Sequence, residues 1–433
     1  MTSNLQIELG WGEGPSERYE SLANRFRGLF SDIRASAVER ETQRILPHDQ
    51  VRTLAKAGFT ALRVPIEFGG SGATLPELFN LLIELGEADS NVVQAIRAHL
   101  GFVEGLLNSK RTAWRAHWFA RVVAGDLVGP GRSETGEVTQ GQYATRLVQR
   151  AGAWILNGTK FYSTGALYAD WIDVGAHGED GTAYVVLVQR DAVGVEPQDD
   201  WNGFGQRLTS SGTTHYRNVA VNPEHIRLDE ERPAYYQAFY QLVHLATAVG
   251  IGRAISRETA QAVRERTRSF SNGNAARVRD DAQILEVVGK LRSSAYSTGA
   301  IVLHTAKSIE RVWQAAQAGD APALQQARAI ADLEIAQSQD LVFELIIDAA
   351  GRLFDALGAS STLTPLALDR FWRNVRTLAT HNPKIYKNRI AGDFAVNGTP
   401  APDQWKIGVV NSAEAVSTPD ATTHATEPVG AIV

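Results

Sequence analysis

A single histidine, His381, stands near the end of a strongly basic segment, "RFWRNVRTLATHNPKIYK" at residues 370–387. Asn382 and Pro383 follow it, and proline interrupts a helix because its ring removes a backbone donor and clashes with the preceding turn. The pattern therefore predicts an imidazole at the C-terminal end of a basic helix. An imidazole exchanges a proton near neutral pH, so we take His381 as a catalytic candidate. It could equally be a packing or capping residue.

Two further segments combine hydroxyl, aromatic and glycine residues. In "LNGTKFYSTGALYADW" at 156–171, Ser163 follows two aromatic residues and precedes a glycine that would let a flat ligand approach closely. In "WNGFGQRLTSSGTTHYRNVAV" at 201–221, Trp201 precedes several glycines and a run of hydroxyl residues. Taken alone, each segment is more typical of a strand end or a glycine-rich hairpin than of a binding site.

Other classes of catalytic site find no support. The chain has no cysteine, and no two of its ten histidines have ligand spacing with a carboxylate beside them, so a zinc or iron site is not expected. There is also no G-x-S-x-G elbow, Walker loop or dinucleotide-binding glycine fingerprint after a strand. We therefore expect no metal ion.

The elements that must position these residues change character twice along the chain. The first third has helical periodicity, and Thr74 with Glu77 forms a capping-box pattern. Short β-branched and aromatic runs follow, with turn signals at "NGTK" (157–160) and "GEDG" (178–181), and indicate a compact antiparallel sheet or barrel. Long helical segments follow Pro233 and indicate a four-helix bundle, whose fourth helix includes "PLALDRFWRNVRTLAT".

The fold class is therefore α+β and multi-domain. We expect an N-terminal helical domain at 15–125, a central β domain at 126–232, a C-terminal four-helix bundle at 233–398 and a tail at 399–433 that is mobile or lies over the surface.

Composition restricts the partners. Lys and Arg number 43 against 48 Asp and Glu, so nothing suggests nucleic acid. No apolar run approaches the roughly 20 residues that span a bilayer, and no export signal is visible, so we expect a cytoplasmic protein without a membrane partner. Met1 is the only sulfur-containing residue. This could be drift, avoidance of oxidisable side chains by a protein that handles reactive oxygen, or economy under sulfur starvation.

Taken together, the segments resemble the acyl-CoA dehydrogenase superfamily over about residues 20–395. "LRVPIEFGGSGATLPEL" is similar to a loop between its early helices, residues 156–171 to the β-domain strand that passes the flavin, and "GFGQRLTSSGTTHYRNVAV" to a family signature. The resemblance implies the acyl-CoA dehydrogenase fold, a flavin between the β domain and the bundle, and a homotetramer in which neighbouring subunits complete the site.

One difference selects a branch of that superfamily. Its dehydrogenases use a glutamate near the end of the bundle, where this chain has His381 and no carboxylate. "DRFWRNVRTLATHNPKIYKNRIAGD" resembles instead the C-terminal motif of the flavin-dependent, dibenzothiophene monooxygenase-like branch. That branch takes reduced FMN from a separate NAD(P)H-dependent flavin reductase, forms a C4a-hydroperoxyflavin with O2 and oxygenates sulfur, nitrogen or carbon.

The scarcity of sulfur favours a small organosulfur substrate and a role in sulfur acquisition by desulfurisation. Three alternatives stay open: an N-hydroxylating flavin monooxygenase acting on an amine or amino sugar, an acyl-CoA dehydrogenase or oxidase with FAD, and a non-enzymatic relative. An acidic anchor in the pocket would favour the amine, and a carboxylate facing the flavin would favour the dehydrogenase.

The resemblance also implies roles for particular residues. His381 would donate a proton or a hydrogen bond near the flavin, and Ser163 would hydrogen-bond the flavin ring. Phe161 and Trp201 would stack on or wall the isoalloxazine, and Ser133 in "GPGRSETG" would be another flavin contact.

Four more residues are binding candidates. Arg266, Arg268 and Arg370 would suit the single phosphate of FMN, because guanidinium groups bind phosphate bidentately, although each could equally be a surface salt-bridge partner. His99 lies on the apolar stripe of its helix, which favours a core position, but the resemblance implies a place in the substrate pocket.

Overall fold

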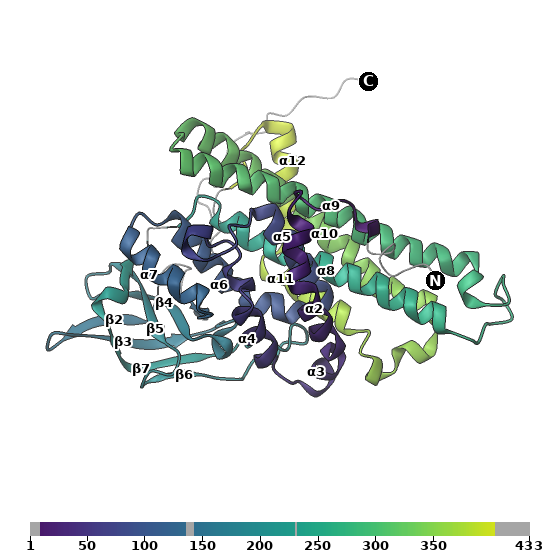
Figure 1. Ribbon diagram of the computed structural model, residues 1–433, viewed down its shortest axis with the longest axis horizontal. Coiled ribbons are helices and arrows are strands. Elements are labelled where there is room, and N and C mark those ends of the chain that lie inside the picture. The colour runs from purple at the N-terminus through teal and green to yellow at the C-terminus, as the bar shows by residue number, and fades with distance from the viewer. Residues whose placement is uncertain (1–8, 136–142, 230–231, 403–433) are drawn as a thin grey trace, which may run out of the picture.

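The computed structural model describes residues 9–135, 143–229 and 232–402. Figure 1 shows an eight-stranded sheet on one side, long C-terminal helices on the other, and N-terminal helices between and over them. The N-terminal helices are α2 (Tyr19–Ala35), α3 (Ala37–Gln43), α4 (His48–Lys56), α5 (Leu75–Ala88), α6 (Ser90–Asn108) and α7 (Thr112–Val123).

Helix α5 begins at the capping box that the sequence predicts. The Thr74 hydroxyl accepts a hydrogen bond from the Glu77 N–H at 3.3 Å, and the Glu77 carboxylate accepts one from the Thr74 N–H at 2.8 Å. Both groups satisfy backbone donors that a helix start leaves free. The helix is buried on nearly every side, because it runs between α2 and α8 (Tyr236–Glu265). A Cβ on Gly250 of α8 would lie 2.5 Å from the backbone of Gly86, so glycines permit this helix crossing.

The sheet is mostly antiparallel, as expected, with two parallel pairings, β1–β4 and β2–β4. Its order is β6-β7-β3-β2-β4-β5-β8, with β1 pairing β4 off this path. The strands are β1 (Val128–Gly131), β2 (Arg146–Arg150), β3 (Ala153–Lys160), β4 (Trp171–His177), β5 (Ala183–Gln189), β6 (Val195–Pro197), β7 (Thr214–Val221) and β8 (Ile226–Leu228).

One of the two turn predictions is wrong. "GEDG" joins β4 to β5, but "NGTK" lies inside β3, where the pairing with β7 shifts by a bulge between Leu156 and Gly158. A Cβ at Gly158 would lie 2.4 Å from the Thr145 hydroxyl, so the glycine allows close packing and a bulge instead of a turn.

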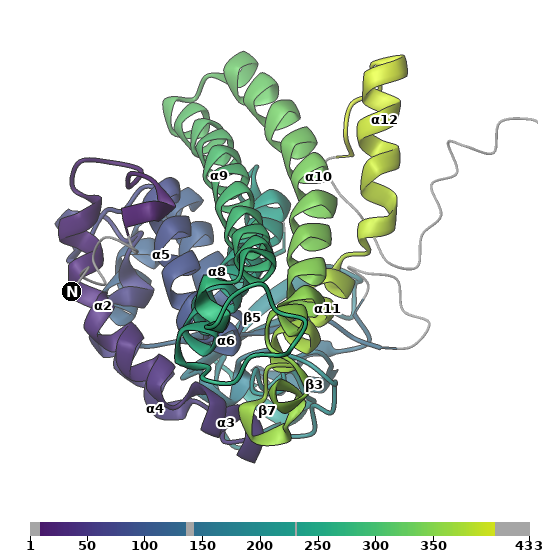
Figure 2. The same ribbon diagram turned by 90° about the vertical axis from the view of Figure 1, so that its right-hand side faces the viewer.

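The C-terminal helices are α8, α9 (Ala282–Ala318), α10 (Ala321–Arg352), α11 (Arg370–His381) and α12 (Lys387–Asn397). In Figure 2, α9 and α10 run side by side and α12 lies along α10. Helix α11 packs on α8 and α10 but is shorter than predicted, because residues 364–366 form a 3-10 turn. None of the helices in the described ranges is both long and apolar enough to cross a membrane.

The expected domain limits at 125/126 and 232/233 fall in the connections between α7 and β1 and between β8 and α8. Residues 403–433 of the predicted tail lie outside the described residues.

Candidate functional site

The two glycine- and hydroxyl-containing segments lie against each other. The Ser163 N–H donates to the Gly212 carbonyl at 2.9 Å, and the Gly165 N–H donates to the Thr209 carbonyl at 2.9 Å. The hydroxyls of Thr164 and Ser211 are 2.8 Å apart. Segments 161–165 and 201–213 therefore form one structural unit, although about 40 residues separate them in sequence.

This unit carries an aromatic surface beside one buried hydroxyl. The rings of Phe161 and Tyr162 have centroids 4.2 Å apart, and Tyr162 meets Trp201 edge-on at 5.9 Å. Trp201 is fixed by its Nε1–H, which donates to the Gln206 carbonyl at 2.9 Å. Ser163 is buried, and its Oγ has no hydrogen-bond partner among the described residues. A buried hydroxyl without a partner is unfavourable unless a ligand completes it.

Ser133 joins the same unit through its backbone, since its carbonyl accepts the Phe161 N–H at 3.0 Å. Both sequence neighbours hold it in place. Arg132 forms salt bridges of 2.8 Å and 2.6 Å with Asp173 and Asp229. Glu134 accepts from the buried Lys160 ammonium at 2.5 Å. Burial is the main reason that the pKa of Lys160 falls to about 8, and Glu134 opposes this change. The Ser133 side chain itself is exposed.

Segment 201–213 also contacts two helices. The Gln206 N–H donates to Asn374 of α11 at 2.6 Å, and the Gln206 amide donates to Ser90 of α6 at 3.0 Å. A Cβ at Gly205 would lie 2.0 Å from the Arg373 carbonyl, so only glycine allows this contact with α11. The loop thereby links the β domain to α6 and α11.

At the end of α11, His381 meets Arg97 of α6 and His244 of α8. The Arg97 guanidinium donates to His381 Nε2 at 3.2 Å. The His244 and His381 rings have centroids 4.3 Å apart, and Arg97 stacks over Tyr240 at 4.8 Å. The Tyr236 ring lies 4.7 Å from that of Tyr240. We call Arg97, Tyr236, Tyr240, His244 and His381 the imidazole cluster.

The charge state of His381 differs from the expectation. The residue is exposed in the single chain, yet desolvation by the surrounding protein and then the positive charge of Arg97 lower the pKa of its imidazole to about 3. Because arginine is always protonated, Nε2 must accept, and the neutral ring carries its proton on Nδ1. This direction takes the pKa of His381 below the neutral range that the sequence suggested, and Nδ1–H is the donor that remains.

His99 is not part of this cluster. Its Nε2 lies 3.1 Å from the Thr60 carbonyl, and its Nδ1 accepts the Val128 N–H at 3.1 Å. Burial lowers the pKa of the imidazole to about 4. With both nitrogens bonded to backbone groups and only 1% of its surface exposed, His99 joins α6 to β1 in the core. This contradicts its assignment to the substrate pocket.

The three arginine candidates for the FMN phosphate do not lie together at one site. Arg370 is buried and donates to both Glu258 oxygens, at 2.7 Å and 2.8 Å, which contradicts a free role as a phosphate ligand. Arg266 donates to the Leu357 and Arg268 carbonyls, and Arg268 is exposed. At 1.5 Å per residue, Arg266 lies about 33 Å along α8 from His244, farther than one FMN extends.

The sequence reasoning named only His381 of the cluster and missed the other four residues, among them Arg97 and His244. Arg97 is a lone charge in the apolar stretch "NVVQAIRAHL", and His244 is a lone histidine in "QLVHLATAVG". An arginine or histidine flanked on both sides by apolar residues within a helix is the signal that could have identified both.

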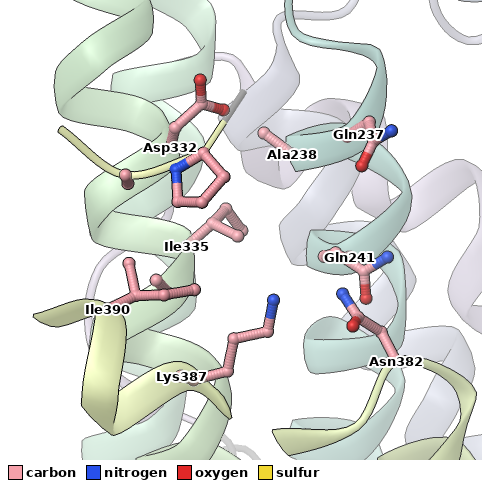
Figure 3. Close-up of a pocket in the computed structure, with 11 residues that line it drawn as sticks. Gln237, Ala238, Gln241, Asp332, Ile335, Asn382, Lys387 and Ile390 are labelled. Carbon is pink, nitrogen blue, oxygen red and sulfur yellow. The ribbon is translucent and has the colours of Figure 1, made fainter. Parts of the chain in front are cut away.

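A recess lies next to the cluster, between α8, α10 and α12 (Figure 3). It includes about 370 Å³, part of it open to solvent. Lys387 points into it near Asn382 and Gln241, and desolvation lowers the pKa of the lysine. Across residues 9–135, 143–229 and 232–402, no group of three or more His, Asp or Glu side chains could hold a metal ion.

Comparisons with known proteins cover nearly the whole described chain. Three family models match: the acyl-CoA dehydrogenase N-terminal domain at residues 16–126, the middle domain at 133–219 and the C-terminal domain at 242–383. The chain is 25% identical over 388 residues to dibenzothiophene monooxygenase of Rhodococcus qingshengii, covering 86% of this chain and 92% of the relative.

It is also 25% identical over 397 residues to a probable FMNH2-dependent monooxygenase, SfnC of Pseudomonas putida, covering 88% of this chain and 96% of that protein. Among solved structures, methanesulfinate monooxygenase MsuC of Pseudomonas fluorescens superimposes with a TM-score of 0.80 at 24% identity, covering 88% of this chain and 98% of the other.

Proposed function

The chain belongs to the acyl-CoA dehydrogenase family, and we propose that it is a reduced-FMN-dependent monooxygenase that adds one oxygen atom to a small organosulfur compound. The observation that carries this proposal is the imidazole cluster. His381 stands where the family's dehydrogenases need a carboxylate base, and its described neighbours are Arg97 and His244. Because Nε2 accepts from Arg97 and Nδ1 carries the ring proton, this imidazole has no free lone pair with which to take a proton from carbon as a glutamate does. It can donate a hydrogen bond from Nδ1.

The residues fit FMN. Ser163 supplies a buried hydroxyl without a partner in the chain, and Phe161, Tyr162 and Trp201 supply a partly exposed aromatic surface beside it. Ser163 would hydrogen-bond the polar edge of the flavin ring, and the aromatic residues would contact its faces. Reduced FMN, when bound, supplies the two electrons with which one atom of O2 leaves as water while the other is transferred.

The chain's own residues then have three tasks. Arg97 holds His381 in one tautomer, so that Nδ1 is the nitrogen that donates. The aromatic surface and the loop at 201–213 exclude water from the reacting face. The salt bridges of Arg132 keep the Ser133 loop in place, so that the binding surface is formed before the flavin arrives.

The two enzymatic rivals each expect a carboxylate in the site. An amine substrate would need an acidic anchor, and an acyl-CoA dehydrogenase would need a base. Within the described part of the chain, no Asp or Glu side chain forms a salt bridge or hydrogen bond with Arg97, His244 or His381. The cluster therefore favours neither rival.

We further propose a cytoplasmic homotetramer that receives reduced FMN from an NAD(P)H-dependent flavin reductase. Large apolar side chains are exposed on the C-terminal segments, among them Phe270, Tyr296 and Ile385 at 68%, 52% and 77%, and a subunit interface would cover them. Arg266 and Arg268 are too far from the cluster within one chain, so they would bind the FMN phosphate of a neighbouring subunit.

The test uses oxygen-18. The protein is supplied with photoreduced FMN under ¹⁸O2, together with an aryl alkyl sulfide, methanesulfinate or benzylamine, and products are analysed by mass spectrometry. One labelled atom on sulfur is expected. Label on nitrogen would favour the amine rival. Hydrogen peroxide as the only product, with bleaching of an FAD-loaded sample by acyl-CoA thioesters, would replace the proposal with a dehydrogenase.

A further inference from the structure

Resting on the proposed function, we propose that Arg97 and His244 bind a negatively charged oxygen group of the substrate. The substrate would then be a small organosulfur oxyanion, of which an alkanesulfinate is the simplest. The proposal states the charge of the substrate and the residues that bind the charged group, and the fold alone determines neither.

The first observation is a cation without a counter-charge. Arg97 is half-buried, and its described partners are a neutral nitrogen of His381 and the face of the Tyr240 ring. Its Nε is buried without a partner. Desolvation lowers the pKa of the guanidinium, and no carboxylate offsets this effect. By contrast, the buried Arg40, Arg63 and Arg370 each form a salt bridge with a carboxylate, at 2.8 Å, 2.8 Å and 2.7 Å. An unpaired buried charge is costly, so an anion arriving from solution would be strongly stabilised.

The second observation is a buried histidine with no hydrogen bonds. His244 has 1% of its surface exposed, and neither Nδ1 nor Nε2 has a partner among the described residues. A neutral imidazole always carries one N–H, which needs an acceptor. Its ring lies against His381, which Arg97 contacts. An oxyanion with two or three oxygens could accept from Arg97 and from the His244 N–H together.

The surroundings suit a small organic group attached to that anion. The Tyr236 and Tyr240 rings are half-buried and line the cluster on α8. Gly101 of α6 makes room for Tyr240, because a Cβ there would lie 1.9 Å from the tyrosine hydroxyl. These rings can contact a short alkyl or aryl group while the polar head faces Arg97.

Sulfinate chemistry is consistent with the transfer of one oxygen atom. The sulfur lone pair forms the new S–O bond, so sulfinate becomes sulfonate. The other atom of O2 leaves as water, with two electrons from reduced FMN and two protons. A carboxylate could occupy the same site but has no lone pair on carbon to receive oxygen, so it would only inhibit.

Calorimetric titration tests the charge preference. Full-length protein in Tris buffer, chosen because many common buffers are themselves sulfonates, is titrated with sodium methanesulfinate and with dimethyl sulfoxide, a neutral molecule of similar shape. Acetate and inorganic phosphate are titrated in parallel. We expect methanesulfinate to bind at least about 10-fold more tightly than dimethyl sulfoxide, because a charge-assisted hydrogen bond is worth roughly 10- to 100-fold in affinity. Excess FMN should not displace methanesulfinate.

Three variants and one control variant refine the test. Arg97→Gln should bind methanesulfinate about 10- to 100-fold more weakly than the wild type and so lose its preference over dimethyl sulfoxide, whereas Arg97→Lys should keep part of that preference. Arg352→Gln is the matched control, because Arg352 pairs with Asp348 on the surface of α10, and it should bind as the wild type does. His244→Phe keeps an aromatic ring without its N–H and should weaken methanesulfinate but not dimethyl sulfoxide.

Three results would overturn the inference. The first is equal affinity of the wild type for methanesulfinate and dimethyl sulfoxide, and the second is unchanged methanesulfinate binding by a folded Arg97→Gln protein. The third is displacement of methanesulfinate by FMN or phosphate, which would make Arg97 a flavin-phosphate ligand. The wild-type comparison needs no variant, so misfolding cannot obscure it. If a neutral aryl sulfide is oxygenated while methanesulfinate does not bind, this inference fails and the monooxygenase remains. If methanesulfinate binds but no sulfur compound is oxygenated, the proposed function fails instead.

Discussion

Replacing Ser163 by alanine should have opposite effects on the free protein and on the FMN complex. In the free protein the Ser163 Oγ is buried without a partner in the described chain, so the substitution breaks no hydrogen bond. The free energy of unfolding should stay unchanged or rise by up to about 1 kcal/mol, because a buried hydroxyl without a partner is destabilising. With FMN bound, one hydrogen bond of about 0.5–1.5 kcal/mol is lost, so the Kd should rise roughly 2- to 12-fold.

Two measurements on the same samples check this prediction. Urea unfolding of FMN-free protein gives the stability, and the quenching of flavin fluorescence on titration gives the FMN affinity. Ser308→Ala is a matched control on α9, because Ser308 is buried but accepts a hydrogen bond from Arg311 at 2.7 Å. It should lose about 1 kcal/mol of stability and keep its FMN affinity. A destabilised FMN-free Ser163→Ala protein, or one with wild-type FMN affinity, would refute the assignment of Ser163.

Three further predictions concern the histidines and arginines. His381→Ala should lower the oxygenation rate by about 100-fold or more and release hydrogen peroxide instead, with FMN affinity little changed; a product yield per reduced flavin equal to that of the wild type would make His381 structural. Burial lowers the pKa of His99 from the ordinary value of 6.5 to about 4 in the folded protein. Between these two pH values the unfolded chain binds a proton that the folded protein does not bind. The free energy of unfolding should therefore fall as the pH drops from about 6.5 towards 4. Urea midpoints measured across this range should show a shallower slope for a folded His99→Gln variant, and an unchanged slope would rule out His99 as a source. Arg370→Gln should reduce stability by about 1–3 kcal/mol, because Glu258 loses both short hydrogen bonds from Arg370 and keeps only the 3.5 Å contact with Arg257, while FMN affinity should change little. Arg268→Gln should weaken FMN binding only in the oligomer. Loss of FMN affinity by a stable Arg370→Gln protein would restore Arg370 as a phosphate ligand.

Features set by neighbouring residues could be predicted from the sequence. The capping box of Thr74 and Glu77 forms as its spacing predicts. The "GEDG" turn joins β4 and β5. Each depends on interactions within a few residues, and these are the same in any fold that contains the segment.

Features set by distant contacts could not be predicted in this way. "NGTK" has the composition of a hairpin turn, but pairing with β7 and packing against Thr145 make it a bulge within β3. Arg370 has the sequence context of a phosphate ligand, yet its Nη2 donates to both carboxylate oxygens of Glu258, 112 residues earlier, and its Nη1 donates to the Ala367 carbonyl. Register and pairing depend on what the rest of the chain places opposite a segment.

His99 and His381 show the same difference between local sequence and distant contacts at the candidate site. The sequence by itself determined the order of a helical, a β and a second helical part, and the branch of the family that the segment around His381 resembles. It also singled out Ser133, Phe161, Ser163 and Trp201, which lie in one structural unit. Only the tertiary structure decided that His99 bonds two backbone groups in the core, whereas His381 meets Arg97 and His244. The physical reason is that burial and partners determine the protonation state and free hydrogen-bonding groups of an imidazole, and both come from residues that folding brings together.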